Sequence, residues 1–394
     1  MLGVSRLLCG TTTETDHLRY GDRRQQSGDG VPRPVVVWTT TRRCNLACLH
    51  CYAAAADRPF PGELSPAEGR AFIADLGQFG VPVLLLSGGE PLLRPDLFEL
   101  AAYAHENGIR TTLSTNGTRI TPEVAQRIKD VGFGYVGISL DGIGQRHDYF
   151  RGQDGAFDAA LDGIRNCVAV GQRVGLRLTL TRHTVQDLDA IFDLIEREQI
   201  NRACFYHLVP SGRGRQIAAD LLAPDEARAA VERIFEQAQS FHRRGLNTEL
   251  LTVDNHSDGV LLYLKVLRED GPVRAAEVLS LLRRNGGNSS GARLAHVDNL
   301  GNVHPDQFWW RQRLGNVRER PFSAIWSDPD NALLHDLRNR RDVLQGRCGR
   351  CQFVDICNGN FRARAEAMTG NTWAEDPGCY LTDREIAPLE AVHA

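Results

Sequence analysis

The sequence predicts an α/β protein built around a parallel β-sheet, because short apolar runs alternate with amphipathic stretches from Val35 onward. Six runs are expected as strands: Val35 to Trp38, Val83 to Leu86, Arg110 to Leu113, Tyr135 to Leu140, Val174 to Leu180 and Ala203 to Val209. Strands joined by helices run parallel through right-handed crossovers. Such a sheet either stays open as a doubly wound layer or curls into a full or partial barrel.

The stretches between these runs are predicted to be helices: Pro66 to Phe79, Pro95 to Asn107, Pro122 to Val131, Ala156 to Val170 and Leu188 to Glu198. Several begin at a proline, which suits the first turn of a helix. In an open sheet and in a barrel alike, the chemistry belongs in the loops at the carboxyl ends of the strands.

Four regions are expected along the chain. Residues 1–34 are polar and loose, which predicts a lead-in and not a folded domain, and residues 35–215 hold the strand–helix repeats. Residues 216–292 are predicted to be a helical connection, with helices at Pro224 to Arg244, Val260 to Asp270 and Ala275 to Asn285. Residues 293–394 form a loop-rich tail with two short strands, around Val297 and Val303.

Composition excludes several classes of protein. With 42% hydrophobic and 24% charged residues in 394, the chain is globular and long enough for two or three domains. Its net charge of −3 offers no basic excess for nucleic acid or an anionic membrane surface. No uncharged apolar window is long enough to span a membrane, and the start lacks a signal peptide. We therefore expect a cytoplasmic protein, in which clustered cysteines more often bind metal than form disulfides.

Cys44, Cys48 and Cys51 follow the first predicted strand in the run Cys-Asn-Leu-Ala-Cys-Leu-His-Cys. Three thiolates so close together can converge on one soft metal centre. An apolar core role gives no reason for the spacing of the three. Zinc, completed by His50, is an alternative, but ligands at neighbouring positions make an awkward tetrahedron. The other interpretation is a [4Fe-4S] cluster with one iron left open.

Small polar motifs stand at the ends of the next three predicted strands: Ser87-Gly88-Gly89-Glu90-Pro91, Ser114-Thr115-Asn116-Gly117 and Ser139-Leu140-Asp141-Gly142. Together with the CxxxCxxC motif they resemble, in the right order, the radical S-adenosylmethionine (radical SAM) superfamily. The resemblance implies a partial (β/α)₆ barrel, and a [4Fe-4S] cluster on Cys44, Cys48 and Cys51.

The resemblance also assigns residues to S-adenosyl-L-methionine. Gly88, Gly89 and Glu90 match the motif that holds the methionine amino group, and Glu90 offers a carboxylate to it. The expected contacts to the ribose and the methionine carboxylate are Ser114, Asn116, Ser139, Asp141 and Arg151. In this chemistry the cluster passes one electron to the sulfonium, and a 5′-deoxyadenosyl radical then abstracts hydrogen from the substrate. A one-electron reductant, flavodoxin- or ferredoxin-like, is the implied partner.

A second cysteine set lies in the tail: Cys348, Cys351, Cys357 and Cys379. Its spacing alone fits a [4Fe-4S] cluster and a structural zinc equally well. The pattern resembles the SPASM-type tail of radical SAM enzymes, which normally holds two auxiliary clusters. Phe361 stands where that pattern has a further cysteine, and Asn299 to Arg311 contains none. The resemblance therefore implies one auxiliary [4Fe-4S] cluster in a SPASM-like iron–sulfur tail domain.

Longer stretches are similar to the tetrapyrrole-modifying branch of the superfamily: Tyr206 to Gly214, Asn285 to Asn288, Gly301 to Trp309 and Trp373 to Tyr380. The resemblance covers about residues 31–386 and is to the heme d1 biosynthesis radical SAM protein and the 12,18-didecarboxysiroheme deacetylase. It implies an iron tetrapyrrole, didecarboxysiroheme, as substrate. The first family replaces two propionates by oxo groups, and the second removes two acetates.

A flat polyanionic macrocycle needs cations for its carboxylates and apolar faces for its ring. Arg213 and Arg215 follow the sixth predicted strand and are candidates for the carboxylates, although a solvated basic loop explains them equally well. The run Phe308-Trp309-Trp310 could flank a ring or belong to the core. His207 and His304 are candidate axial ligands to the substrate iron, against the commoner structural role of histidine.

Two other functions compete. A radical SAM peptide maturase shares both cysteine sets, but it commonly adds a peptide-recognition domain, for which residues 1–34 are too short. A non-enzymatic zinc-binding interaction protein accounts for the cysteines but not for the glycine and asparagine motifs at the strand ends.

Overall fold

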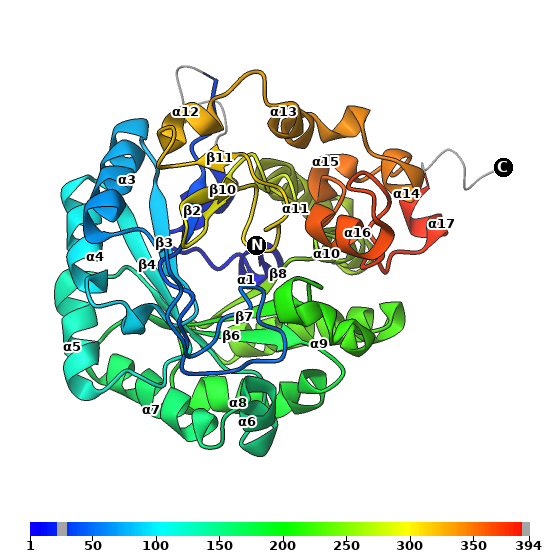
Figure 1. Ribbon diagram of the computed structural model, residues 1–394. Helices are drawn as coiled ribbons and strands as arrows, with labels where there is room; N and C mark the ends of the chain where they lie inside the picture. Colours follow the sequence, from blue (N-terminus) through cyan, green and yellow to red (C-terminus); the bar gives the residue numbers. More distant parts are fainter. Residues whose placement is uncertain (22–29, 388–394) are drawn as a thin grey trace.

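A computed structural model describes residues 1–21 and 30–387. Parts of the predicted lead-in and of the tail, residues 22–29 and 388–394, lie outside the described residues. One sheet of eleven strands runs through the fold, in the order β1-β8-β7-β6-β5-β4-β3-β2-β9-β10-β11. The sheet curls, and Figure 1 shows α3, α4, α5, α7 and α8 in an arc around its outer face.

The six predicted strands are confirmed as β2 (Val35–Thr39), β3 (Val83–Ser87), β4 (Arg110–Thr115), β5 (Val136–Ser139), β6 (Val174–Leu180) and β7 (Arg202–His207). Each pairs in parallel with the next, beginning with Val36 of β2 opposite Leu84 of β3. Parallel pairing brings all six carboxyl ends to one edge, where the predicted motifs lie. The expected α/β fold with a curled parallel sheet is confirmed.

The connecting helices are α3 (Pro66–Phe79), α4 (Leu97–Glu106), α5 (Pro122–Val131), α7 (Ala156–Ala169) and α8 (Leu188–Arg197). As predicted, a proline begins two of these helices, α3 and α5. Ser65 caps α3 by accepting from the Glu68 N–H in a full capping box, and Thr121 caps α5 by accepting from the Val124 N–H. A further helix, α6 (Gln145–Arg151), precedes α7 and carries Arg151.

The region predicted as a helical connection contains α9 (Pro224–Arg243), α10 (Ser257–Glu269) and α11 (Gly271–Asn285), and also a strand that was not expected. This strand, β8 (Glu249–Val253), pairs in parallel with β7. The lead-in also contributes to the fold through α1 (Val4–Cys9), α2 (Asp16–Tyr20) and β1 (Leu2–Gly3), which pairs antiparallel with β8. The lead-in was expected to be loose and not a folded domain, and its residues 2–20 instead form short elements that join the fold because β1 is buried against β8.

The two short strands predicted in the tail are β9 (Leu294–Val297) and β10 (Asn302–His304), followed by β11 (Gly315–Asn316). Strand β9 pairs in parallel with β2, so the tail continues the barrel sheet. Short helices complete the tail: α12 (Phe322–Trp326), α13 (Ala332–Arg338), α14 (Gly346–Gly349), α15 (Val354–Cys357), α16 (Arg362–Thr369) and α17 (Asp383–Ile386). The domain boundaries at residues 215 and 292 stay a prediction.

A continuous apolar core fills the space between the sheet and its helices, with Trp38, Phe192 and Phe235 among its largest buried side chains. Among the described residues, no helix combines the length and apolarity needed to cross a bilayer.

Candidate functional site

The loop after β2 carries the first cysteine set and lies against the glycines that follow β3. The Gly89 N–H donates to the Thr41 carbonyl at 2.7 Å, and the Glu90 N–H donates to the Arg43 carbonyl at 2.8 Å. A Cβ on Gly89 would lie 2.4 Å from the Arg43 oxygen, so only glycine allows this approach. The glycines after β3 thus admit the backbone of the cysteine loop, and their expected contact with S-adenosyl-L-methionine stays a prediction.

Arg213 fastens the same loop from the segment after β7. Its Nε donates to the Cys48 carbonyl at 2.8 Å and its Nη1 to the Ala55 carbonyl at 2.5 Å. Its own N–H donates to the Cys51 carbonyl at 3.0 Å. These contacts differ from the expected contact with substrate carboxylates, because Nε and Nη1 are bound by the backbone of the cysteine loop, and Nη2 is buried without a partner. Arg213 holds the loop in place.

The three sulfurs lie among polar donors. Arg151 Nη1 donates to Cys48 Sγ at 3.5 Å, and the Ala55 N–H donates to Cys51 Sγ at 3.4 Å. Burial raises the pKa of the Cys44 thiol to about 12. Buried thiols of this kind become thiolates when a metal centre supplies positive charge. Three converging cysteines among such donors fit an iron–sulfur cluster.

Glu90 is fully buried and faces the end of β4. Its carboxylate accepts from the Thr115 hydroxyl at 2.8 Å, from the Asn116 N–H at 2.8 Å and from the Leu92 N–H at 3.0 Å. Burial raises its pKa in spite of these donors. The contacts of Glu90 thus tie the ends of β3 and β4 together, and a contact with the amino group of S-adenosyl-L-methionine stays a prediction.

Asp141 and Arg151 form a buried ion pair beside the first cysteine set. Burial alone would raise the pKa of Asp141, but the Arg151 guanidinium and a hydrogen bond from the Thr179 N–H outweigh it, and the pKa is lowered. His50 Nε2 lies 3.7 Å from the Asp141 carboxylate, and burial lowers the pKa of His50 to about 4. His50 is therefore a neutral ring next to a charged pair.

An inner cavity of about 120 Å³ opens at the carboxyl ends of the strands. Of the predicted cofactor residues, Ser114, Ser139 and Arg151 line it, whereas Gly88, Gly89, Glu90, Asn116 and Asp141 stand behind its wall. Asn116 donates to the Asn45 side chain at 3.0 Å, within the cysteine loop. All eight residues thus lie at one edge of the sheet, and three of them line the cavity.

Buried polar atoms without a protein partner point to a polar ligand in this cavity. Among the described residues they include His50 Nδ1, Arg151 Nε, Arg177 Nε and Asp254 Oδ2, and all four side chains line the cavity. Unpaired buried groups of this kind are costly unless something binds them. The cavity therefore fits a ligand rich in donors and acceptors, as S-adenosyl-L-methionine is.

Sequence reasoning missed Arg177, Asp254 and Tyr52 in the cavity wall. Arg177 is the one charged residue in the apolar strand β6, and that break in the pattern is a usable signal. Tyr52 directly follows Cys51 and approaches the Ser87 hydroxyl at 3.3 Å. Asp254 follows β8 with a left-handed φ of 66°, and a strand that was not predicted gave no signal for it.

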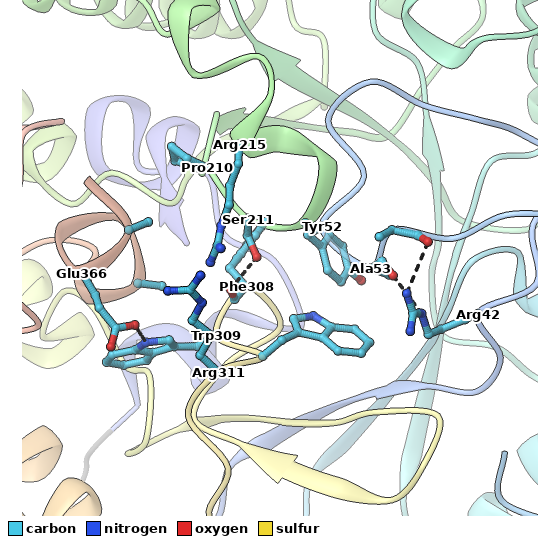
Figure 2. A pocket seen from close by; sticks show the side chains of 15 residues that line it. Arg42, Tyr52, Ala53, Pro210, Ser211, Arg215, Phe308, Trp309, Arg311 and Glu366 are labelled. Atoms are coloured by element: carbon cyan, nitrogen blue, oxygen red, sulfur yellow. Dashed lines mark hydrogen bonds between the residues drawn. The ribbon is translucent and has the colours of Figure 1, made fainter. Parts of the chain in front are cut away.

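An outer cavity of about 260 Å³ adjoins the inner one, because Tyr52 and Phe308 line both. Its wall combines aromatic side chains from the segment after β10 with the arginines Arg42, Arg215 and Arg311 (Figure 2). Arg215, predicted from the sequence, lines this cavity and Arg213 does not. Phe308 and Trp310 line it, while Trp309 is buried at its base.

The two candidate axial histidines differ in their contacts. His207 lines the inner cavity and shares a hydrogen bond of 3.1 Å between its Nε2 and the buried Asp258 carboxylate. His304 is buried away from both cavities. Its Nδ1 contacts the Gln312 carbonyl at 3.0 Å and its Nε2 the Asp298 carboxylate at 3.3 Å. With both nitrogens engaged, His304 fits the structural role that the sequence analysis gives as the commoner alternative.

The four tail cysteines line one pocket between α10 and the loops around α14 and α15. Burial raises the pKa of Cys379 to about 11, and Cys357, the most buried, has a pKa raised well above its usual value. Among residues 1–21 and 30–387, no three ligating side chains are grouped to hold a single metal ion. Four cysteines around one pocket suit a [4Fe-4S] cluster or a structural zinc, and the auxiliary cluster stays a prediction.

A buried ion pair supports the loop that carries Cys379. Arg364 makes two parallel contacts with Asp376, Nε to Oδ1 at 2.8 Å and Nη2 to Oδ2 at 2.7 Å. The same carboxylate accepts from the Phe361 N–H at 2.9 Å. Phe361 itself is buried and packs edge-on against Phe308, with ring centroids 5.6 Å apart. An apolar side chain thus occupies the position where the SPASM-type pattern has a further cysteine.

Comparison with known proteins decides the family. Residues 38–195 match the Radical SAM superfamily. Over 99% of its length the chain is 53% identical to all of the Fe-coproporphyrin III synthase of Methanosarcina barkeri. It is also 44% identical over 90% of its length to the pre-heme d1 synthase of Dinoroseobacter shibae, of which it covers 88%. The chain belongs to the radical SAM superfamily.

The resemblance predicted from the motifs is therefore confirmed, and the protein is a radical SAM enzyme. Enzymes of this superfamily use a [4Fe-4S] cluster and S-adenosyl-L-methionine. The solved structures agree on the fold: SuiB of Streptococcus suis, bound to the precursor peptide SuiA, matches 89% of this chain with a TM-score of 0.71 and 18% identity. The match covers 76% of that chain.

Proposed function

We propose that this radical SAM enzyme acts in heme biosynthesis and removes two acetate side chains from 12,18-didecarboxysiroheme. The observation that carries the proposal is the pair of adjoining cavities, which share Tyr52 and Phe308 as lining residues. The inner one lies beside the first cysteine set, and the outer one offers arginines and aromatic rings to a flat polyanion. Similarity over the full length to an Fe-coproporphyrin III synthase favours acetate removal over propionate oxidation, since loss of both acetates leaves an iron porphyrin with four propionates.

In this proposal Cys44, Cys48 and Cys51 hold the catalytic [4Fe-4S] cluster. Bound there with S-adenosyl-L-methionine, it supplies the radical that abstracts hydrogen. Ser114, Ser139, Arg151 and the residues behind them orient that cofactor in the inner cavity. The two cavities share Tyr52 and Phe308 as lining residues, and we expect the edge of the macrocycle to approach the reacting atoms there while its remaining carboxylates stay with the arginines.

We further propose that Cys348, Cys351, Cys357 and Cys379 bind one auxiliary [4Fe-4S] cluster in a SPASM-like tail. All four line one pocket, and four thiolates can fully ligate such a cluster. A flavodoxin- or ferredoxin-like protein supplies single electrons.

The test is an anaerobic assay of the reconstituted enzyme with didecarboxysiroheme, S-adenosyl-L-methionine and a reductant, followed by mass spectrometry of the tetrapyrrole. We expect loss of two acetate side chains and formation of 5′-deoxyadenosine, with Cys48→Ser as the variant without turnover. Oxidised, shortened propionates would assign the enzyme to the heme d1 branch instead. An unchanged tetrapyrrole beside abundant 5′-deoxyadenosine would refute the substrate.

A further inference from the structure

Two arginines from distant segments face each other across the outer cavity. Arg215 comes from the loop after β7 and Arg311 from the segment after β10, and Figure 2 shows their guanidinium groups pointing toward one another. Neither guanidinium has an ion pair or a hydrogen bond to another group in the described part of the chain. Two like charges held face to face repel each other, and an anion between them removes that repulsion.

The acid that lines the cavity does not neutralise them. Glu366 accepts from the Trp309 indole N–H, and from the Gln312 amide at 2.7 Å. Arg42, the third arginine, is occupied elsewhere: its Nε donates to the Ala53 carbonyl at 2.9 Å. Arg215 and Arg311 are therefore the two lining cations whose donors face the cavity without a partner.

The wall beside the pair suits an aromatic ring. Trp310 is fixed by a 2.8 Å hydrogen bond from its indole N–H to the Gln307 carbonyl. Phe308 is held edge-on to Tyr52, with ring centroids 5.2 Å apart. Rings positioned in this way present apolar faces without further loss of side-chain freedom. Cations and fixed rings in one cavity select a ligand that is flat, apolar in its body and anionic at its rim.

We propose that Arg215 and Arg311 clamp one carboxylate of a flat polycarboxylate ligand from both sides, while its ring lies against Phe308 and Trp310. The inference rests on the proposed function, because the ligand is then a propionate-bearing tetrapyrrole. The clamp fixes which edge of the macrocycle enters the inner cavity and which edge stays outside. It is a binding device and takes no part in bond breaking.

Binding of coproporphyrin III, which carries four carboxylates and needs no turnover, tests the clamp. Titration of the anaerobically reconstituted enzyme, followed by quenching of tryptophan fluorescence, gives its Kd. Arg215→Gln and Arg311→Gln should each weaken binding about tenfold, as expected for a hydrogen bond to a charged group. If both arginines hold the same carboxylate, the double variant should lose less than the product of the two single losses.

Arg313→Gln is the matched control. Arg313 lies two residues beyond Arg311, is exposed, pairs with Glu319 at 3.1 Å and does not line the cavity, so binding should stay within about twofold of the parent. The tetramethyl ester of coproporphyrin III should bind the parent and both clamp variants equally. Iron content and the thermal midpoint establish that the variants are folded.

The outcomes separate the clamp from the proposed function. Equal coproporphyrin III binding by the parent and both clamp variants overturns the clamp, even if didecarboxysiroheme is converted. Weakened binding in the clamp variants, with no conversion of didecarboxysiroheme by the parent, upholds the clamp and overturns the substrate. Strictly multiplicative losses would mean two separate carboxylate sites and would overturn the two-sided arrangement.

Discussion

The two cysteine sets are held by different means. The loop with Cys44, Cys48 and Cys51 is fastened by its own backbone, through the carbonyls that Arg213 and the β3 glycines engage, and its sulfurs face polar donors. The tail set lies in a pocket behind short helices and depends on a buried ion pair beneath Cys379. A three-cysteine loop beside a cavity can leave one metal position open to a ligand, whereas four cysteines can close a site completely. The contrast predicts that the first set exchanges ligands and the second does not.

Removal of one cysteine from each set is the strongest test of that contrast. Cys48→Ala should reduce S-adenosyl-L-methionine cleavage by about three orders of magnitude or more, about 4 kcal/mol of activation free energy. Cys351→Ala should retain cleavage but lose about four of about eight iron atoms, because only the auxiliary cluster is lost. Iron analysis and 5′-deoxyadenosine yield measure both. Equal loss of cleavage in the two variants would contradict separate roles.

Breaking the ion pair beneath Cys379 is the next largest effect. Asp376→Asn leaves the Arg364 guanidinium buried and uncompensated, so the free energy of unfolding should fall by about 3–5 kcal/mol. Arg341→Ala breaks an exposed ion pair with Asp355 in the same tail and should change the free energy of unfolding by about 0.5 kcal/mol at most. Denaturant unfolding of the reconstituted protein compares the two variants. Similar midpoints for the two variants would show that the tail does not depend on the buried pair.

Asp254, in the wall of the inner cavity, makes the stability of the protein depend on pH. Burial raises its pKa to about 7, from an ordinary value of 3.8. Since the folded state retains a proton that the unfolded chain releases, stability falls as the pH rises from about 4 to about 7 and is constant above that. Asp254→Asn removes this loss, so the variant should gain about 2–3 kcal/mol relative to the parent between pH 5 and pH 8. Parallel curves of unfolding free energy against pH would show that Asp254 is not neutral in the folded protein.

The sequence predicted the repeat region closely because two periodicities agreed there. Apolar runs such as Val35 to Trp38 are buried on both faces, and proline marks the start of α3 and α5. The motifs at the strand ends followed directly, since parallel pairing brings every carboxyl end to one edge. Strand β8 was not predicted, because its five residues lie between two helices. Only its pairing with β1 and β7 identifies it as a strand.

Side-chain direction at the site could not be predicted from the sequence. Arg213 and Arg215 are two residues apart in one basic loop, yet one is bound by backbone carbonyls and the other lines the outer cavity. Arg311 gave no signal, because its partner across the cavity lies almost a hundred residues away in the chain. Such pairings depend on how the tail packs against the barrel, and local spacing carries no information about that packing.

The smallest expected effect concerns Arg213, and it tests whether that residue belongs to the cysteine loop or to the substrate. Arg213→Lys can keep one of the two side-chain contacts to the Cys48 and Ala55 carbonyls, so the loop should lose about 1 kcal/mol. Iron of the first set should then be released to a chelator about fivefold faster, since about 1 kcal/mol is a factor of about five. Release from the tail and the KM for the tetrapyrrole should not change, whereas Arg215→Lys should raise that KM and leave iron release alone. A higher KM for Arg213→Lys with normal iron release would contradict this. It would mean that Arg213 of the parent contacts the substrate and not the loop carbonyls, and the difference between Arg213 and Arg215 would disappear.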